Sequence, residues 1–203
     1  MTGQRAVGVF GGSFNPPHLA HLAVASDVCA MLDLESVLFV PAAAPVHREV
    51  ADDVPASTRL EMTALAVRGD ERFSVSSVEI DLVLRYTLDV VAELGRRLSP
   101  RRLVFILGSD SLLQFGSWHQ PSAILELCRV AVAARPGDDL RTVEEEARRW
   151  GREAVTVLPT VAMDISSSMI RERVRIGLPI DYLVPGPVRL FIRDARLYRG
   201  TAP

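Results

Sequence analysis

Short apolar runs alternate along this chain with longer segments of helical periodicity, and this alternation constrains the fold more than any other feature. The runs lack polar alternation, as strands covered on both faces do, and they are Ala6–Phe10, Ser36–Val40, Leu103–Leu107, Val130–Ala134 and Val155–Leu158. The helical patterns are Leu19–Leu32, Thr58–Val67, Thr87–Leu98, a shorter one around Pro121–Leu127, and Leu140–Arg152. Segment Arg72–Asp81 alternates more and could form an extra strand. The order predicts an α/β fold, an open parallel sheet with helices on both faces and right-handed crossovers.

Length and charge narrow the class of protein. A chain of 203 residues fits a single domain over residues 1–203 better than two domains. The net charge is −2 and no basic block is present, so nucleic acid is not an expected partner. The sequence lacks an apolar signal core and a stretch of membrane-spanning length, which favours a cytoplasmic enzyme with no membrane partner. It leaves the oligomeric state open, a homo-oligomer included.

Two residue types limit the chemistry. All 23 basic residues are arginine, so the chain has no Walker A lysine, pyridoxal Schiff base or lysyl-adenylate intermediate. Any phosphate site must therefore use arginine, histidine or backbone N–H groups. The cysteines, Cys29 and Cys128, stand alone among apolar residues without CxxC spacing, which predicts free buried thiols. The absence of GxGxxG excludes an ordinary dinucleotide-binding fingerprint.

The segment GGSFNPPHLAH, residues 11–21, directly follows the first apolar run. Gly11 and Gly12 predict a turn in which backbone N–H groups approach an anion closely, and the next helix should begin at Pro17 or His18. His18 and His21 would then share one face at the positive end of that helix, where negative charge is favoured. An ordinary turn with two capping histidines is the alternative, but the combination of elements favours a phosphate site.

Further unusual residues follow the other predicted strands, where ligands of an open parallel sheet gather. The loop after Leu103–Leu107 is GSDS, in which Asp110 could bind a ribose hydroxyl or a hydrated Mg²⁺ ion. The loops after Ser36–Val40 and Val130–Ala134 carry charged residues beside prolines, namely His47, Arg48 and Arg135.

A second strong pattern is ISSSMIR, residues 165–171. Serines at a helix start expose hydroxyl and backbone donors, and Arg171 lies about one turn later, where it can reach the same anion. Taken alone, the pattern could equally be an N-cap run followed by a surface arginine.

Together these segments resemble the nucleotidyltransferase superfamily, whose signatures are GG[ST]F[DN]P with HxGH and, later, ISS[TS]xxR. The middle of the chain, with RYTL at 85–88, GSDSLLQFGSWHQPSAIL at 108–125 and AARPGDDL at 133–140, resembles bacterial nicotinate-nucleotide adenylyltransferases. The ending YLVPGPVRLFIRDARLY also fits, so the resemblance covers nearly the whole chain. It implies a Rossmann-like fold of the nucleotidyltransferase type. It also implies transfer of AMP from ATP to nicotinate mononucleotide, which yields nicotinate adenine dinucleotide and pyrophosphate in NAD biosynthesis.

The resemblance assigns roles to individual residues. His18, His21 and Arg171 are the catalytic candidates, and the ATP site comprises these with Gly11, Gly12, Ser13, Phe14, Gly108, Asp110, Ile165, Ser167 and Ser168. On the acceptor side, Trp118 would stack on the pyridine ring, and backbone amides near Thr87 and His119 would receive the nicotinate carboxylate. His47, Arg48 and Arg135 complete the acceptor set. Mg²⁺ is expected mainly on the ATP phosphates, with no protein metal ligands.

The chain departs from the family pattern at two places. Ala20 replaces the usual glycine of HxGH, and its methyl group could crowd the nucleotide. The residues 42–44 are alanines where the family often has asparagine. The alternatives that remain are another acceptor, namely nicotinamide mononucleotide or phosphopantetheine, a cytidylyltransferase of the same superfamily, and a nucleotide sensor without turnover. A class I aminoacyl-tRNA synthetase core is disfavoured, because the chain has no lysine for that family's second signature.

Overall fold

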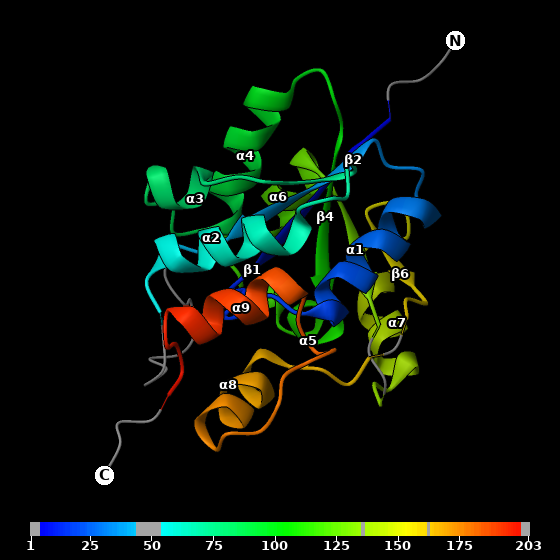
Figure 1. Cartoon of the computed structure of the whole chain (residues 1–203). Coiled ribbons are helices and arrows are strands. Elements are labelled where there is room, and N and C mark those ends of the chain that lie inside the picture. The colour runs from blue at the N-terminus through cyan, green and yellow to red at the C-terminus, as the bar shows by residue number, and fades with distance from the viewer. Residues whose placement is uncertain (1–4, 44–53, 135–136, 162, 200–203) are drawn as a thin grey trace.

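The computed structural model describes residues 5–43, 54–134, 137–161 and 163–199. A sheet of six parallel strands in the order β3-β2-β1-β4-β5-β6 forms its centre (Figure 1). The strands are β1 (Val7–Gly12), β2 (Ser36–Pro41), β3 (Phe73–Val75), β4 (Leu103–Gly108), β5 (Arg129–Ala133) and β6 (Val155–Leu158). The chain winds outward from β1 to β3 and then returns to pair β4 with the other side of β1. This reversal opens a crevice beyond the carboxyl ends of β1 and β4, where open sheets bind ligands.

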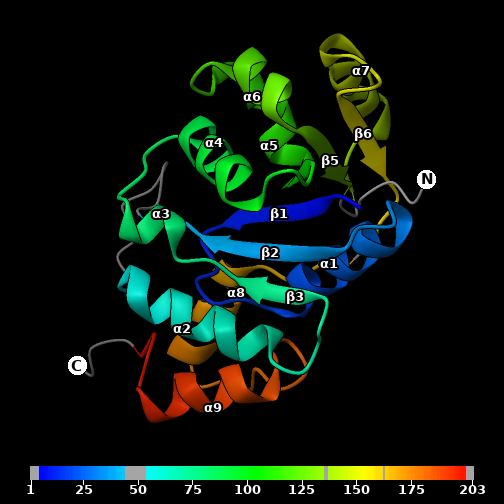
Figure 2. The same cartoon turned by 90° about the horizontal axis from the view of Figure 1, so that it is seen from above.

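Helices cover both faces of the sheet, as predicted (Figure 2). They are α1 (Leu19–Met31), α2 (Ala56–Val67), α3 (Val78–Asp81), α4 (Thr87–Leu98), α5 (Ser109–Leu113), α6 (Pro121–Leu127), α7 (Leu140–Trp150), α8 (Ser167–Arg175) and α9 (Gly186–Asp194), with a short 3-10 turn at Phe115–Ser117. Figure 2 shows α4, α5 and α6 on one side of the sheet and α1, α2, α8 and α9 on the other. No helix in the described ranges is both long and apolar enough to cross a membrane.

Three apolar clusters hold these layers together. One cluster packs the α4 face of the sheet and includes Phe105 and Phe115, and another packs the α1 face and includes Phe39. A third joins α2, α8 and α9 through side chains such as Ile170 and Ile192, both almost fully buried. Burial of each such side chain stabilises the fold by about 1.5–3 kcal/mol. The third cluster fixes α8 against the rest of the protein. The N-terminus of α8 therefore has a defined position at the crevice.

The predicted strands and helices are confirmed to within a few residues, and α4 and α6 have the predicted bounds. The extra strand predicted over Arg72–Asp81 is right only for Phe73–Val75, because Val78–Asp81 forms the single turn α3. Serine side chains favour this change: the Ser76 hydroxyl accepts a hydrogen bond from the backbone N–H of Val78. Such local side-chain bonds compete with strand pairing.

The predicted turn at Gly11 and Gly12 is wrong. Both glycines continue β1 and pair with Val40 and Pro41 of β2. A Cβ on Gly12 would lie 3.1 Å from the ring of Phe14, and a Cβ on Gly11 would lie 3.1 Å from the ring of Phe105. A side chain at either position would require the neighbouring aromatic ring to shift, which favours glycine at both.

Two other local predictions need correction. Helix α1 begins at Leu19, with His18 as its N-cap residue, so the predicted start is early by one or two residues. The GSDS segment is not a loop, since Gly108 ends β4 and α5 begins at Ser109. The hydroxyl of Ser109 bonds the carboxylate of Asp138, which ties this short helix to the segment before α7. Cys29 and Cys128 are free and buried, as predicted.

Candidate active site

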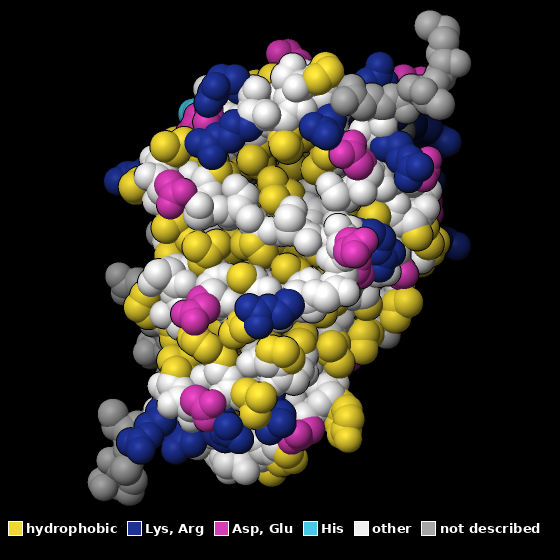
Figure 3. All heavy atoms as spheres, turned by 45° about the horizontal axis from the view of Figure 1, so that its top comes forward, with side chains coloured by type: hydrophobic (Ala, Val, Ile, Leu, Met, Phe, Trp, Pro, Cys, Tyr) yellow, Lys and Arg dark blue, Asp and Glu magenta, His cyan; other side chains and the backbone are white. Residues whose placement is uncertain are grey.

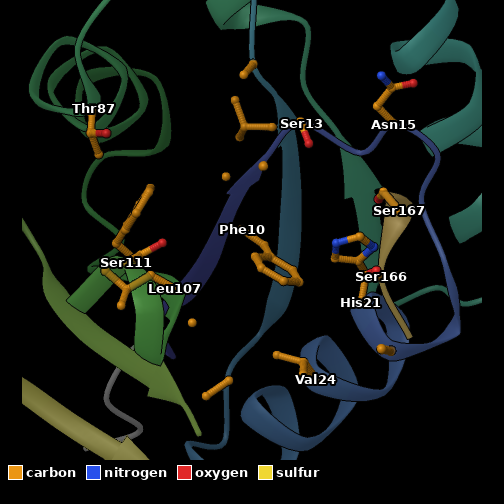
Figure 4. Close-up of a pocket in the computed structure, with 18 of the residues that line it drawn as sticks. Phe10, Ser13, Asn15, His21, Val24, Thr87, Leu107, Ser111, Ser166 and Ser167 are labelled. Carbon is orange, nitrogen blue, oxygen red and sulfur yellow. The ribbon is translucent and has the colours of Figure 1, made fainter. Parts of the chain in front are cut away.

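A cavity of about 800 Å³ lies at the crevice between β1 and β4 (Figure 4). Phe10 stands in its middle, with Thr87 and Ser111 on one side and His21, Ser166 and Ser167 on the other. We call the first side the aromatic end and the second the histidine end. The predicted site residues that line the cavity are Gly11, Gly12, Ser13, His18, His21, Thr87, Gly108, Trp118, His119, Ile165, Ser167, Ser168 and Arg171. Segments far apart in the sequence therefore meet in one place.

The two histidines of the histidine end form a stacked pair at the start of α1. The ring centroids of His18 and His21 are 3.6 Å apart, with the planes 24° from parallel. The backbone N–H of His18 donates to Nδ1 of His21 at 3.2 Å. A neutral His21 then carries its proton on Nε2, so that nitrogen is a hydrogen-bond donor. The ring of Phe14 packs edge-on against the ring of His21, at a centroid distance of 5.0 Å.

The start of α8 completes the histidine end. Ser166 is the N-cap residue, and its hydroxyl accepts a hydrogen bond from the N–H of Met169. The Ser167 hydroxyl donates to the carbonyl of Pro16 at 2.8 Å, and Nη1 of Arg171 donates to the carbonyl of Asn15 at 2.8 Å. These bonds join the two motifs across about 150 residues of chain. The positive end of α8 and the histidine pair thus face the same space, where an anion is favoured.

The aromatic end is built on the other side of β1. Trp118 packs on Phe105 and Phe115, at centroid distances of 6.2 and 5.2 Å, and is half-buried. The ring of Tyr86 stacks on the ring of His119 at 4.1 Å. A planar ring could lie among these side chains, because stacked and edge-on aromatic contacts are favourable. Trp150, in contrast, packs away from the cavity against Phe115.

Two charged residues, the buried Arg59 and the half-buried Glu79, position the backbone around the cavity. Arg59 of α2 has only 2% of its surface exposed and donates to the carbonyls of Ser13 at 2.8 Å and Ala43 at 3.3 Å. The N–H of Ala43 donates in turn to the carboxylate of Glu79 at 2.9 Å. Desolvation by burial raises the pKa of the Glu79 carboxyl, while the bond from Ala43 and the charge of Arg59 oppose that rise. Both polar groups of Ala43 are thereby fixed.

Comparison with known proteins places this site in a family. The family model described as cytidylyltransferase-like matches residues 9–173. A relative from Saccharopolyspora erythraea, named "probable nicotinate-nucleotide adenylyltransferase", is 39% identical over 98% of this chain and 92% of its own length. One from Geobacter metallireducens with the same name is 36% identical over 94% of this chain and 97% of its own length. This chain belongs to the nicotinate-nucleotide adenylyltransferase family.

Solved structures agree with the adenylyltransferase fold. Plasmodium falciparum nicotinic acid mononucleotide adenylyltransferase has been solved complexed with APC and complexed with NaAD. Each superposes with a TM-score of 0.77 at 15% sequence identity, over 96% of this chain and 97% of the other. The overall fold of this chain is therefore that of the solved adenylyltransferases.

Some predicted site residues do not reach the cavity of this adenylyltransferase. Phe14 is fully buried in the α1-side cluster, with a φ of 47°. Its ring packs against Gly12 and against the ring of His21. Asp110 lies on α5 outside the lining. His47, Arg48 and Arg135 lie outside the described residues.

The cavity also holds residues that sequence reasoning did not assign. Asn15 is buried, and its side-chain oxygen accepts a hydrogen bond of 2.6 Å from the hydroxyl of Tyr198. Ala20, which replaces the family's glycine, lines the cavity at the start of α1. Other unassigned lining residues include Phe10, Glu79, Arg85, Tyr86, Ser111 and Asp164. Three of these residues belong to motifs already quoted from the sequence: Asn15 to NPPH, and Arg85 and Tyr86 to RYT. Those motifs could therefore have identified them as site residues.

Metal-binding side chains do not gather in the described part of this adenylyltransferase. Its described residues contain no group of three or more His, Cys, Asp or Glu side chains that could hold a metal ion. The cysteines are poor ligands here, since burial raises the pKa of the Cys128 thiol to about 12 and also raises that of Cys29. Phosphate oxygens of a bound nucleotide fit a divalent cation better than these side chains do.

Proposed function

We propose that this protein transfers the AMP group of ATP to nicotinate mononucleotide and releases nicotinate adenine dinucleotide and pyrophosphate. The observation that carries the proposal is one continuous cavity with anion-binding groups at one end and stacking rings at the other. A triphosphate and a pyridine nucleotide need these two environments. The names of the curated relatives and of the solved Plasmodium enzyme support the same substrates.

In this proposal the triphosphate binds at the histidine end. His18 and His21 contact the phosphates and stabilise the charge that develops at the transferred phosphorus. The start of α8, with Ser168 and Arg171, holds the β- and γ-phosphates, while the hydroxyl of Ser167 keeps α8 attached to Pro16. The terminal backbone of β1 and β4, at Gly11, Gly12 and Gly108, lies beneath the nucleotide.

The acceptor binds at the aromatic end. Trp118 stacks on the pyridine ring, and backbone N–H groups near Thr87 and His119 receive the ring carboxylate. The acceptor's phosphate then points along β1 toward the α-phosphorus of ATP. His47, Arg48 and Arg135, which lie outside the described residues, remain candidates for that phosphate.

The chemistry needs no general base. A nucleotide monophosphate has a second pKa of about 6, so its phosphate is mostly a dianion at neutral pH. One of its oxygens attacks the α-phosphorus in line, the bond to the pyrophosphate oxygen breaks, and pyrophosphate leaves. The protein positions the two phosphates and stabilises charge. Mg²⁺ carried by the ATP phosphates would supply further charge neutralisation.

Location and partners are part of the proposal. We place the enzyme in the cytoplasm, where ATP is available, and expect no nucleic-acid or membrane partner. The net charge of −2 supports this expectation. On the face drawn in Figure 3, arginine and carboxylate side chains are interspersed. A nucleic-acid site would need a continuous basic patch.

The test is pyrophosphate release by the purified protein with ATP and Mg²⁺. Nicotinate mononucleotide, nicotinamide mononucleotide and phosphopantetheine are offered in separate reactions. Strong preference for the nicotinate compound would support the proposal. Turnover only with phosphopantetheine would keep the ATP site and overturn the acceptor. ATP binding without turnover on any acceptor would favour a nucleotide sensor.

A further inference from the structure

Arg85 lies in the cavity wall at the aromatic end, directly before Tyr86 and Thr87 at the start of α4. Its side chain is exposed, and no hydrogen bond or ion pair joins it to another residue in the described ranges. The stack of Tyr86 on His119 places this segment beside Trp118. Arg85 thus brings a full positive charge to the place where the acceptor's ring is proposed to lie.

The other charged residues that line the described part of the cavity either have partners in the protein or lie away from the aromatic end. Arg171 is at the histidine end and donates to the carbonyl of Asn15. The Glu79 carboxylate accepts from Ala43 and interacts with Arg59. Asp164 lies on the segment that leads into α8. A negative charge on a ligand at the aromatic end would therefore find its countercharge in Arg85.

We propose that Arg85 selects the acceptor by pairing with a carboxylate on the pyridine ring, and so favours nicotinate over nicotinamide mononucleotide. A guanidinium can bind a carboxylate through two parallel N–H···O bonds, which a neutral carboxamide cannot match. Backbone N–H groups alone distinguish these rings less well, because a carboxamide oxygen also accepts from them. Phe105 and Val90, both buried, line the same cavity, and apolar walls strengthen the attraction between opposite charges inside it.

This inference rests on the proposed function, because it takes the pyridine ring to lie at the aromatic end. The experiment compares kcat/KM for nicotinate and nicotinamide mononucleotides in the wild type, Arg85→Gln and Arg85→Lys. Arg96→Gln is the matched control, since it removes one arginine charge near the far end of α4, the helix that begins two residues after Arg85. The Arg96 side chain pairs with Glu93 on the surface. Arg96 lies nine residues beyond Thr87, the first residue of α4, which is about 14 Å along the helix axis.

We expect Arg85→Gln to lower kcat/KM for nicotinate mononucleotide by about tenfold to a hundredfold, mainly through KM, because the ring carboxylate does not react. The values for nicotinamide mononucleotide and the KM for ATP should stay within about twofold, and Arg85→Lys should restore part of the preference. Equal losses with both acceptors, or none, would overturn the role of Arg85 while leaving the proposed function intact. A wild type that transfers no AMP to nicotinate mononucleotide would overturn the proposed function itself and this inference with it.

Discussion

At the scale of single residues, the stacked pair of His18 and His21 carries the largest predicted effect on rate. We expect His18→Asn to lower kcat by about a hundredfold to a thousandfold, because the amide of asparagine is shorter than the imidazole and cannot carry a positive charge toward the developing phosphate charge. Asparagine suits the N-cap position that His18 occupies, so α1 should keep its start. Steady-state pyrophosphate release measures kcat, and a thermal melt by circular dichroism reports the fold. A folded variant with near-normal kcat would contradict the role of His18.

A second residue-scale prediction concerns Glu79 and pH. Burial raises its folded-state pKa above the ordinary value of 4.5, so the folded protein holds this proton more tightly than the unfolded chain. This carboxyl therefore makes folding less favourable as pH rises from below its unfolded pKa to above its folded pKa. We expect Glu79→Gln to be more stable than the wild type at neutral pH and equally stable at about pH 4, since its amide oxygen can still accept from Ala43. Urea unfolding at both pH values measures the difference, and a difference that does not change with pH would contradict the prediction.

At the scale of elements, Arg59 connects α2 to the segments that follow β1 and β2. Arg59→Leu removes the donors to the carbonyls of Ser13, Ala43 and Val54 and leaves these partly buried oxygens without that donor. We expect a loss of about 3 kcal/mol and a melting temperature lower by roughly 6–12 °C. The KM values for ATP and the acceptor should both rise, since Ser13 lines the cavity and Ala43 adjoins its wall.

The control for Arg59 lies directly after the same helix. Arg68 is exposed at the C-terminal end of α2, and Arg68→Leu should change the melting temperature little. If both leucine variants melted alike, or if Arg59→Leu changed the KM for one substrate only, the proposed connection would be wrong.

The sequence predicted those elements whose own residues determine them. Continuous apolar runs predicted the central strands because both of their faces are buried, and helical periodicity predicted α4 and α6 to the residue. Failures occurred where tertiary contacts decide the local conformation. Gly11 and Gly12 suggest a turn, but pairing with Val40 and Pro41 of β2 extends β1 through both of them. No local pattern carries that information.

The same distinction holds for the candidate site. The histidine pair and the start of α8 were predictable because each is a short local motif at a helix terminus. Arg59 and Glu79 were missed, since each is a single charged residue whose partner lies far along the chain. Arg59 bonds Ser13 across 46 residues, and Glu79 bonds Ala43 across 36.

At the scale of the whole molecule, the two free cysteines lie in opposite layers and test the proposal of a single domain over residues 1–203. Cys29 is buried with α1, and Cys128 is buried in the cluster on the α4 face. Burial raises the pKa of Cys128 to about 12, so at about pH 8 its native thiol should resist alkylation by iodoacetamide. Because both layers share one sheet, we expect the thiols to become reactive at the same urea concentration. The variants Cys29→Ala and Cys128→Ala each keep one thiol, and mass spectrometry of its alkylation reports the unfolding of one layer at a time. Reaction of Cys29 at a distinctly lower urea concentration would show that the α1 layer unfolds as a separate unit.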